Sequence, residues 1–297
     1  MRKKTDKTKY AIIAALVVYI IWGFTFLASK VAQKWVTPFI LMAYRFDLAA
    51  LLLALPMVFG WRKVKLRGKK IGRLILMGLF EPCLYFIGEQ YGVRFTNSAF
   101  SGVMIAIIPI VTILLASVFL KDRPSSAQVI FCILSIAGII IISLSENKDG
   151  AVSLKGILCL LVAVFTGSAY TVVSRGLSDE FTVYERTLVM EILGAVFFTC
   201  FALLENHNNL KAIIEPLRYK DVVLAIVYLA VFASVIGYTL FNYAVSNAPM
   251  AKVVVLCNLT TVISVLAGIV LLGDPFTPVS LIAMIIVLIG IWGVQKY

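Results

Sequence analysis

Long apolar stretches alternate with short polar breaks along the chain, and this pattern predicts a bundle of membrane-spanning helices. Each stretch holds about 20 residues, which as a helix is the length that crosses the hydrocarbon core of a bilayer. We expect ten such helices, at about residues 10–29, 37–60, 72–93, 98–120, 127–145, 154–174, 183–204, 220–242, 250–272 and 277–295. Because the breaks between them are short, neighbouring helices should pack antiparallel.

The second half of the chain repeats the pattern of the first half. A displacement of 152 positions superimposes distinctive residues: Tyr91 on Tyr243, Asp122 on Asp274 and Gly138 on Gly290. After a small gap, the second helices also match, with Arg45 on Arg186. Each repeat has an odd number of helices, so the second crosses the membrane in the opposite sense. The predicted fold is an all-α integral membrane protein with ten transmembrane helices as two inverted five-helix repeats, residues 1–150 and 151–297.

Composition and charge agree with a membrane protein whose two ends face the cytoplasm. The chain is 61% hydrophobic and 14% charged, whereas a soluble domain is about half apolar and about a quarter charged. Basic residues gather beside two apolar stretches: Arg2, Lys3, Lys4, Lys7 and Lys9, and then Arg62, Lys63, Lys65, Arg67, Lys69, Lys70 and Arg73. Such clusters keep loops in the cytoplasm and attract anionic lipid, so the net charge of +12 does not indicate nucleic-acid binding. We expect a multi-pass protein of the plasma membrane.

The sequence lacks the motifs of an enzyme, so we expect no catalytic residues, no metal site and no cofactor. All five cysteines lie inside apolar stretches without a C-x-x-C pair, and the single histidine, His207, lies in a polar loop. Asp122 and Asp274 should lie at opposite membrane faces, which excludes a catalytic aspartate pair. There is no P-loop, so the chain is not by itself a transport ATPase.

An acidic stripe on the third predicted helix is the strongest candidate for a binding site. Glu81, Tyr85 and Glu89 are spaced i, i+4, i+8 and therefore share one helix face. An ionisable group at membrane depth costs several kcal/mol unless it is paired or hydrated. We expect Glu81 to bind a cationic group or to take up a proton. The alternative is a hydrogen-bonded structural carboxyl between helices.

Other polar and aromatic residues divide between a binding role and packing. Aromatic side chains that could surround an organic cation or pack as core are Trp22, Phe24, Tyr170 and Tyr238. Asn258, Thr260 and Thr261 form a polar patch on the ninth predicted helix, where such groups either hold a solute or join helices. We expect a structural ion pair between Arg45 and Glu89, and a pairing of Arg186 with Glu191 or Glu185.

The chain resembles the EamA-type transporters of the drug/metabolite transporter superfamily. The resemblance rests on Trp22-Gly23-Phe24, on Tyr44-Arg45-Phe46 and on the stretch from Tyr91 to Asp122 with Pro109 inside it. It implies a ten-helix exporter or exchanger of amino acids, metabolites or toxic organic compounds. The chain departs from the family where Glu-Pro is frequent, since it has Ile108-Pro109 and Thr260-Thr261 there.

These observations predict a secondary transporter that exports a small organic solute, an amino acid or a related metabolite, by alternating access. The acidic stripe favours a solute with an amine, and protons are a candidate coupling ion. The alternatives are a multidrug or organic-cation exporter and a membrane scaffold or accessory subunit without transport of its own. The expected partners are the solute and the lipid bilayer, and the expected state is a monomer or a homodimer.

Overall fold

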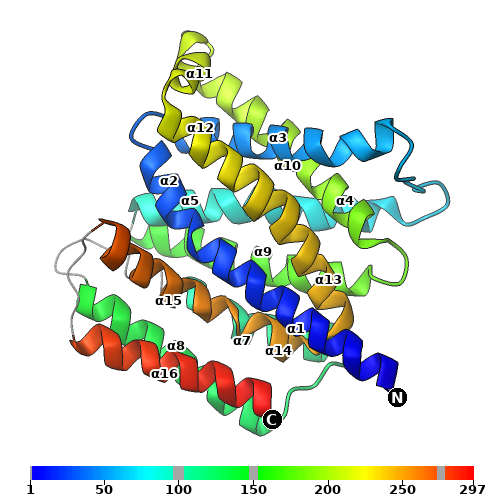
Figure 1. The fold of residues 1–297 in the computed structure, drawn as a ribbon, viewed down its shortest axis with the longest axis vertical. Coiled ribbons are helices and arrows are strands. Elements are labelled where there is room, and N and C mark those ends of the chain that lie inside the picture. Colours follow the sequence, from blue (N-terminus) through cyan, green and yellow to red (C-terminus); the bar gives the residue numbers. More distant parts are fainter. Residues whose placement is uncertain (1, 96–103, 147–152, 273–277) are drawn as a thin grey trace.

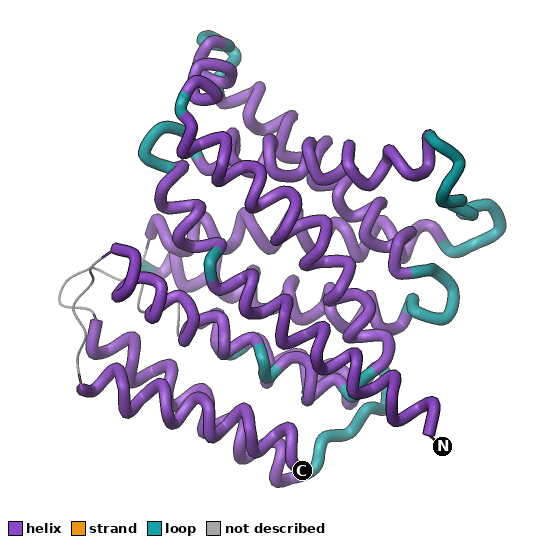
Figure 2. The backbone as a smooth tube through the Cα atoms, viewed as in Figure 1, coloured by secondary structure: helices purple, strands orange, loops and turns teal. Residues whose placement is uncertain are grey.

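The computed structural model describes residues 2–95, 104–146, 153–272 and 278–297. The described part of the chain is a bundle of helices joined by short loops (Figures 1 and 2). Both chain ends lie at the same end of the bundle in Figure 1. This is the arrangement expected of a chain that crosses the membrane an even number of times.

The first half contains eight of the described elements. They are α1 (Arg2–Gly23), α2 (Thr25–Ala32), α3 (Pro38–Val58), α4 (Ile71–Gly78), the wide turn η1 (Leu79–Leu84), α5 (Tyr85–Phe95), α7 (Ile108–Phe119) and α8 (Ser126–Glu146). Thr37 begins α3 as an N-cap, because its hydroxyl accepts from the Ile40 backbone N–H. We refer to α1 with α2 as the first span, and to α4, η1 and α5 as the third span.

The second half contains the remaining described elements. They are α9 (Leu154–Gly176), α10 (Val183–Glu205), α11 (Lys211–Ile214), η2 (Glu215–Arg218), α12 (Lys220–Val227), the wide turn η3 (Tyr228–Tyr238), α13 (Thr239–Asn247), α14 (Met250–Val254), α15 (Cys257–Ala267), η4 (Gly268–Leu272) and α16 (Pro278–Lys296). We refer to α12, η3 and α13 as the eighth span, and to α14, α15 and η4 as the ninth span.

The apolar helices match the ten predicted spans. Seven stretches of the described chain are long and apolar enough to cross a membrane: Asp6–Ser29, Pro38–Val58, Ile71–Gly92, Leu154–Gly176, Val183–Glu205, Lys220–Asn247 and Met250–Leu271. Three shorter apolar helices complete the set: Met104–Phe119, Ser126–Ile141 and Leu281–Lys296. The predicted all-α membrane fold is therefore confirmed. The proposed boundary between repeats, at 150 and 151, lies outside the described residues and stays a prediction.

The last helices of the two halves, α8 and α16, pack against each other in a two-fold manner (Figure 1). A Cβ atom on Gly138 would lie 2.9 Å from the Ala283 carbonyl oxygen. A Cβ atom on Gly290 would lie 2.7 Å from the Phe131 carbonyl oxygen. The displacement of 152 that relates Gly138 to Gly290 also relates Phe131 to Ala283. Equivalent glycines thus meet equivalent backbones, as at an interface between two copies of one unit.

The other helices of the two halves interlock in the same way. The second helices, α3 and α10, pack together, α5 of the third span packs on α9, and α13 of the eighth span packs on α1. The third helix of each half therefore packs against the first helix of the other half. As a result, the centre of the bundle is lined by both halves.

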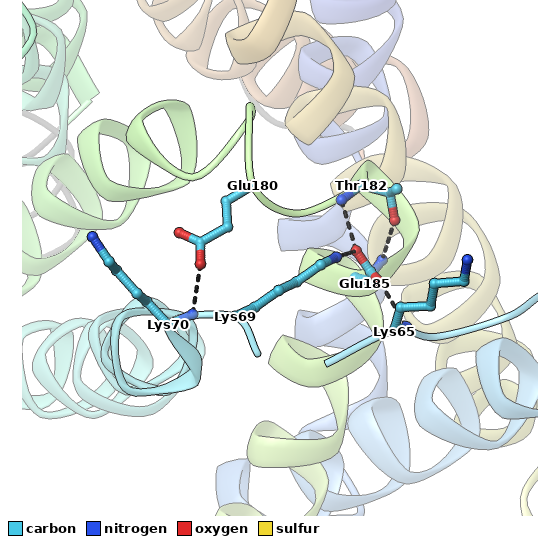
Figure 3. A network of polar contacts seen from close by, with 6 residues as sticks. All are labelled: Lys65, Lys69, Lys70, Glu180, Thr182 and Glu185. Carbon is cyan, nitrogen blue, oxygen red and sulfur yellow. Dashed lines mark hydrogen bonds and ion pairs between the residues drawn. The ribbon is translucent and has the colours of Figure 1, made fainter. Parts of the chain in front are cut away.

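Polar contacts join the two halves where the basic loop after α3 meets the start of α10 (Figure 3). Lys69 Nζ forms an ion pair with Glu185 Oε2 at 2.7 Å, and the Lys65 backbone N–H donates to Glu185 Oε1 at 2.9 Å. The Lys70 backbone N–H donates to Glu180 Oε1 at 2.6 Å. Thr182 and Glu185 also form a reciprocal capping box at the start of α10. Glu185 therefore pairs with Lys69, and Arg186, the expected partner, turns elsewhere.

Candidate functional site

The third span is interrupted at Glu81, and the interruption places this carboxyl group inside the bundle. Pro82 has no backbone N–H to donate and disfavours a helical conformation for the residue before it. Glu81 adopts an extended backbone (φ −144°, ψ 123°), its peptide bond to Pro82 is cis, and regular helix resumes at Tyr85. Irregular backbone at membrane depth requires cover from protein or a water-filled space. Glu81 is 9% exposed, so protein provides most of that cover.

A tyrosine from the second half holds the Glu81 carboxyl group. The Tyr238 hydroxyl donates to Glu81 Oε1 at 2.7 Å. Glu81 belongs to the third span and Tyr238 lies at the end of η3 in the eighth span. The hydrogen bond therefore joins the two halves at the point where the third span is broken.

Three of the four predicted aromatic residues come together beside Glu81. The Trp22 and Tyr238 ring centroids are 5.1 Å apart, and those of Tyr170 and Tyr238 are 6.1 Å apart in an edge-to-face arrangement. Trp22 Nε1 donates to the Ala233 carbonyl oxygen at 3.0 Å, which fixes the indole on the eighth span. Phe24 is half-buried at the end of α1, and no ring contact with this cluster is found among the described residues. We call Trp22, Tyr170 and Tyr238, with Tyr19 and Phe241 that pack on them, the aromatic cluster.

Arg45 does not form the expected ion pair with Glu89. Its Nε donates to Ser234 Oγ at 2.9 Å, and its guanidinium carbon lies 5.2 Å and 5.1 Å from the ring centroids of Phe46 and Phe86. Glu89 Oε1 instead accepts from the Tyr85 hydroxyl at 3.0 Å, four residues earlier on the same helix face. Rings around a guanidinium shield it from water and attract it through their π faces. Tyr85 and Glu89 therefore share a helix face, Glu81 lies at the break before them, and Arg45 is hydrogen-bonded by the eighth span instead.

A third carboxyl group, Glu191 of α10, faces the same region. It is fully buried, and neither of its carboxyl oxygens makes a hydrogen bond among the described residues. Arg45 and Glu81 act on it electrostatically, and Ser234 lies near it with a geometry that falls short of a hydrogen bond. The expected pairing of Glu191 with Arg186 does not form. The Arg45 guanidinium therefore interacts electrostatically with three carboxyl groups: Glu81, Glu89 and Glu191.

Arg186 is instead bound by uncharged groups of two spans, α9 and the eighth span. Its NH1 donates to the carbonyl oxygen and the hydroxyl of Ser174, at 2.5 Å and 2.7 Å. Its NH2 donates to the Asn242 carbonyl oxygen at 3.1 Å and to Ser246 Oγ at 2.5 Å. The Tyr170 hydroxyl donates to Asn242 Oδ1 at 3.1 Å, so Asn242 links this network to the aromatic cluster.

A transporter family matches nearly all of the chain. The EamA-like transporter family matches residues 9–144 and 154–295. The chain belongs to this family. It is similar to the uncharacterized transporter YcxC of Bacillus subtilis (strain 168), with 32% identity over 95% of this chain and 92% of the relative. An uncharacterized transporter of Archaeoglobus fulgidus is 24% identical over 97% of this chain and 99% of its own length. A crystal structure of a protein 18% identical to the chain superimposes with a TM-score of 0.79 and covers 96% of each chain, which supports the fold alone.

In this EamA-like transporter the polar patch of the ninth span contacts two different helices, α8 and α1. Asn258 is 1% exposed, and its Nδ2 donates to Ser135 Oγ of α8 at 2.9 Å. Thr260 Oγ1 donates to the Tyr19 carbonyl oxygen at 3.5 Å, and Thr261 is half-buried. Hydrogen bonds between helices are the commoner use of such groups in membranes. The structure therefore brings Asn258 to the fifth helix rather than to the acidic site, and the binding roles of Asn258 and Thr261 stay predictions.

Several residues of the site in this EamA-like transporter were not predicted from the sequence. Tyr19 lies three residues before Trp22, and Ser234 lies four residues before Tyr238, so each shares a helix face with a residue that was identified. That spacing was a usable signal. No such signal marks Glu191 as unpaired, because an arginine and a second acid lie within six residues of it.

Proposed function

We propose that the chain is a secondary transporter that binds an amine-bearing small organic solute between its two halves, with Glu81 as the anionic anchor. The observation that carries the proposal is the hydrogen bond from Tyr238 to Glu81 at the break in the third span. Secondary transporters bind solutes at discontinuous helices near the bilayer midplane, where their repeats meet. Glu81 combines these features with a negative group.

The surroundings of Glu81 suit an ammonium group. Trp22, Tyr170 and Tyr238 offer ring faces, which attract cations most strongly where water is excluded. One guanidinium acts on two carboxyl groups of the third span, Glu81 and Glu89, so the site has spare negative charge that a cationic solute would neutralise. An ammonium group that reaches the Glu81 carboxylate would compete with the Tyr238 hydroxyl for it, and one bound farther away would leave this hydrogen bond in place.

The charge pattern and the fold also bear on the membrane, the direction of transport and the solute class. The basic residues before α1 and after α3 favour cytoplasmic termini in a plasma membrane. An amino acid or a related metabolite, moved outward by alternating access, is the first choice, and an organic cation without a carboxylate is the second. In a scaffold or accessory subunit, the third choice, the same groups would serve only to join helices.

A thermal-stability screen of the purified protein tests the proposal. The panel pairs each amino acid with its decarboxylated amine, such as phenylalanine with phenethylamine and lysine with cadaverine. A ligand at about 100 times its Kd raises stability by about 2.7 kcal/mol. We expect stabilisation by at least one member, and we expect Glu81→Gln to abolish it because the ammonium group loses its counter-charge.

The control is Asp47→Asn, which removes a carboxylate of α3 that accepts a hydrogen bond from Thr199, outside the acidic site. This variant should keep the stabilisation. A preference for the amino acid over its amine supports the first choice, and equal effects support the second. Stabilisation that survives Glu81→Gln would contradict the assigned site, and a panel without effect would favour the scaffold.

A further inference from the structure

Glu191 differs from the other two acids of the site in having no hydrogen-bond donor. Glu81 accepts from Tyr238, and Glu89 accepts from Tyr85. Both oxygens of Glu191 lack a partner among the described residues, and the side chain is 0% exposed. An ionised carboxylate in such a place carries a large desolvation cost that no hydrogen bond offsets. A carboxylic acid, by contrast, can be buried at a modest cost.

The titratable groups that face Glu191 come from three elements packed near α10. They are Arg45 of α3, Glu81 of η1 and Tyr170 of α9. In the part of the chain that the structure describes, α4, α13 and η3 also pack on α10, but no titratable group of theirs, Tyr238 included, acts on Glu191. Arg45 is the one cation of this set, and Ser234 currently holds its Nε. A negative Glu191 would therefore find its only positive partner in Arg45.

We infer that Glu191, Ser234 and Arg45 form a proton-binding site separate from Glu81. In this conformation Glu191 carries a proton, and when it loses that proton it pairs with the guanidinium of Arg45 instead. When the proton passes to water, the carboxylate is left bare and attracts Arg45 away from Ser234. Arg45 then withdraws its charge from Glu81 and Glu89. Loss of a proton in α10 would thus alter the charge of the solute site. This inference deepens the proposed function and depends on it for the link to transport.

Infrared spectroscopy of the full chain in liposomes tests the proton directly and needs no solute. We expect a carboxylic-acid C=O band near neutral pH that shifts in D2O and disappears in Glu191→Gln. Glu89→Gln is the matched control, because Glu89 lies in the same charge cluster but has a hydrogen-bond donor, and it should keep the Glu191 band. If Glu191→Gln leaves the band unchanged, Glu191 is ionised and the inference is overturned.

The role of Arg45 is tested by the pH at which this band is lost. An opposite charge nearby shifts the titration of a carboxyl group by about 1–3 pH units. Arg45→Gln should therefore move the loss of the Glu191 band to higher pH by that amount, whereas Arg45→Lys, which keeps the charge, should move it less. An unchanged midpoint in Arg45→Gln would overturn the exchange. Since no ligand takes part, these results stand apart from success or failure of the amine screen.

Discussion

Arg45 and Arg186 occupy matching places in the two repeats, yet their surroundings are opposite in kind. Arg186 donates to four oxygens of Ser174, Asn242 and Ser246, all of them uncharged. Arg45 donates to one hydroxyl, lies between two phenylalanine rings and acts on three carboxyl groups. The repeated fold places a guanidinium in the bundle twice. The neighbouring side chains alone give Arg186 a structural role and make Arg45 a candidate member of the binding site.

The source of this difference lies in the third and eighth spans. By the displacement of 152, Glu81 corresponds to Ala233 and Glu89 corresponds to Phe241. Trp22 donates to the Ala233 carbonyl oxygen and packs on Phe241, with ring centroids 5.3 Å apart. The positions that carry acids in the first half therefore support the aromatic cluster in the second half. An inverted repeat can in this way bring an acidic face and an aromatic face to the same centre.

The largest expected effect separates the two arginines by stability. Arg186→Met should lower the free energy of unfolding by about 3–5 kcal/mol, because buried acceptors lose their charged donor. Arg45→Met should cost about 1–2 kcal/mol, since it removes one hydrogen bond and two ring contacts, and the carboxyl groups that lose its charge can neutralise by taking up protons. Denaturant unfolding in detergent micelles measures both. Equal losses would show that the two arginines are not distinguished by their surroundings.

A smaller effect is expected where the halves are equivalent. Gly138→Ala and Gly290→Ala each push a methyl group against a backbone carbonyl of the facing helix, at 2.9 Å and 2.7 Å. Overpacking of this kind costs about 1–3 kcal/mol. The two variants should lose similar stability in thermal unfolding, and Gly72→Ala, with open space around it, should lose none by this route. A loss confined to one of the two glycines would break the two-fold relation of α8 and α16.

The smallest effect is expected from a substitution that gives the second half the residue type of the first at one position. Tyr238 corresponds to Phe86, which has the ring without the hydroxyl. Tyr238→Phe removes the hydrogen bond to Glu81 and should cost about 1 kcal/mol of stability. The double variant with Glu81→Gln should cost less than the sum of the two single variants, because Glu81→Gln weakens and Tyr238→Phe removes the same hydrogen bond. Additive losses in thermal unfolding would show that the hydroxyl and the carboxyl group act independently.

Much of the fold could be predicted because it depends on local features of the sequence. The length of apolar stretches defines the spans, and the position of Pro82 predicts the break at Glu81. The repeat was visible because Gly138 and Gly290 keep one register. The partners of the charged residues were predicted less well. Arg45 was assigned to Glu89 and Arg186 to an acid of its own helix, and both assignments differ from the structure.

The sequence by itself determined the apolar spans, the inverted repeat, the family and the place where the third span is broken. Hydropathy, proline geometry and helical spacing act over a few residues, so they can be read along the chain. Only the tertiary structure decided that Arg45 meets Ser234, 189 positions away, and that Glu191 has no donor. Each residue turns a helix by about 100°, so a small rotation of one span exchanges one partner for another. That rotation is set by packing across the whole bundle, as at the glycines of α8 and α16.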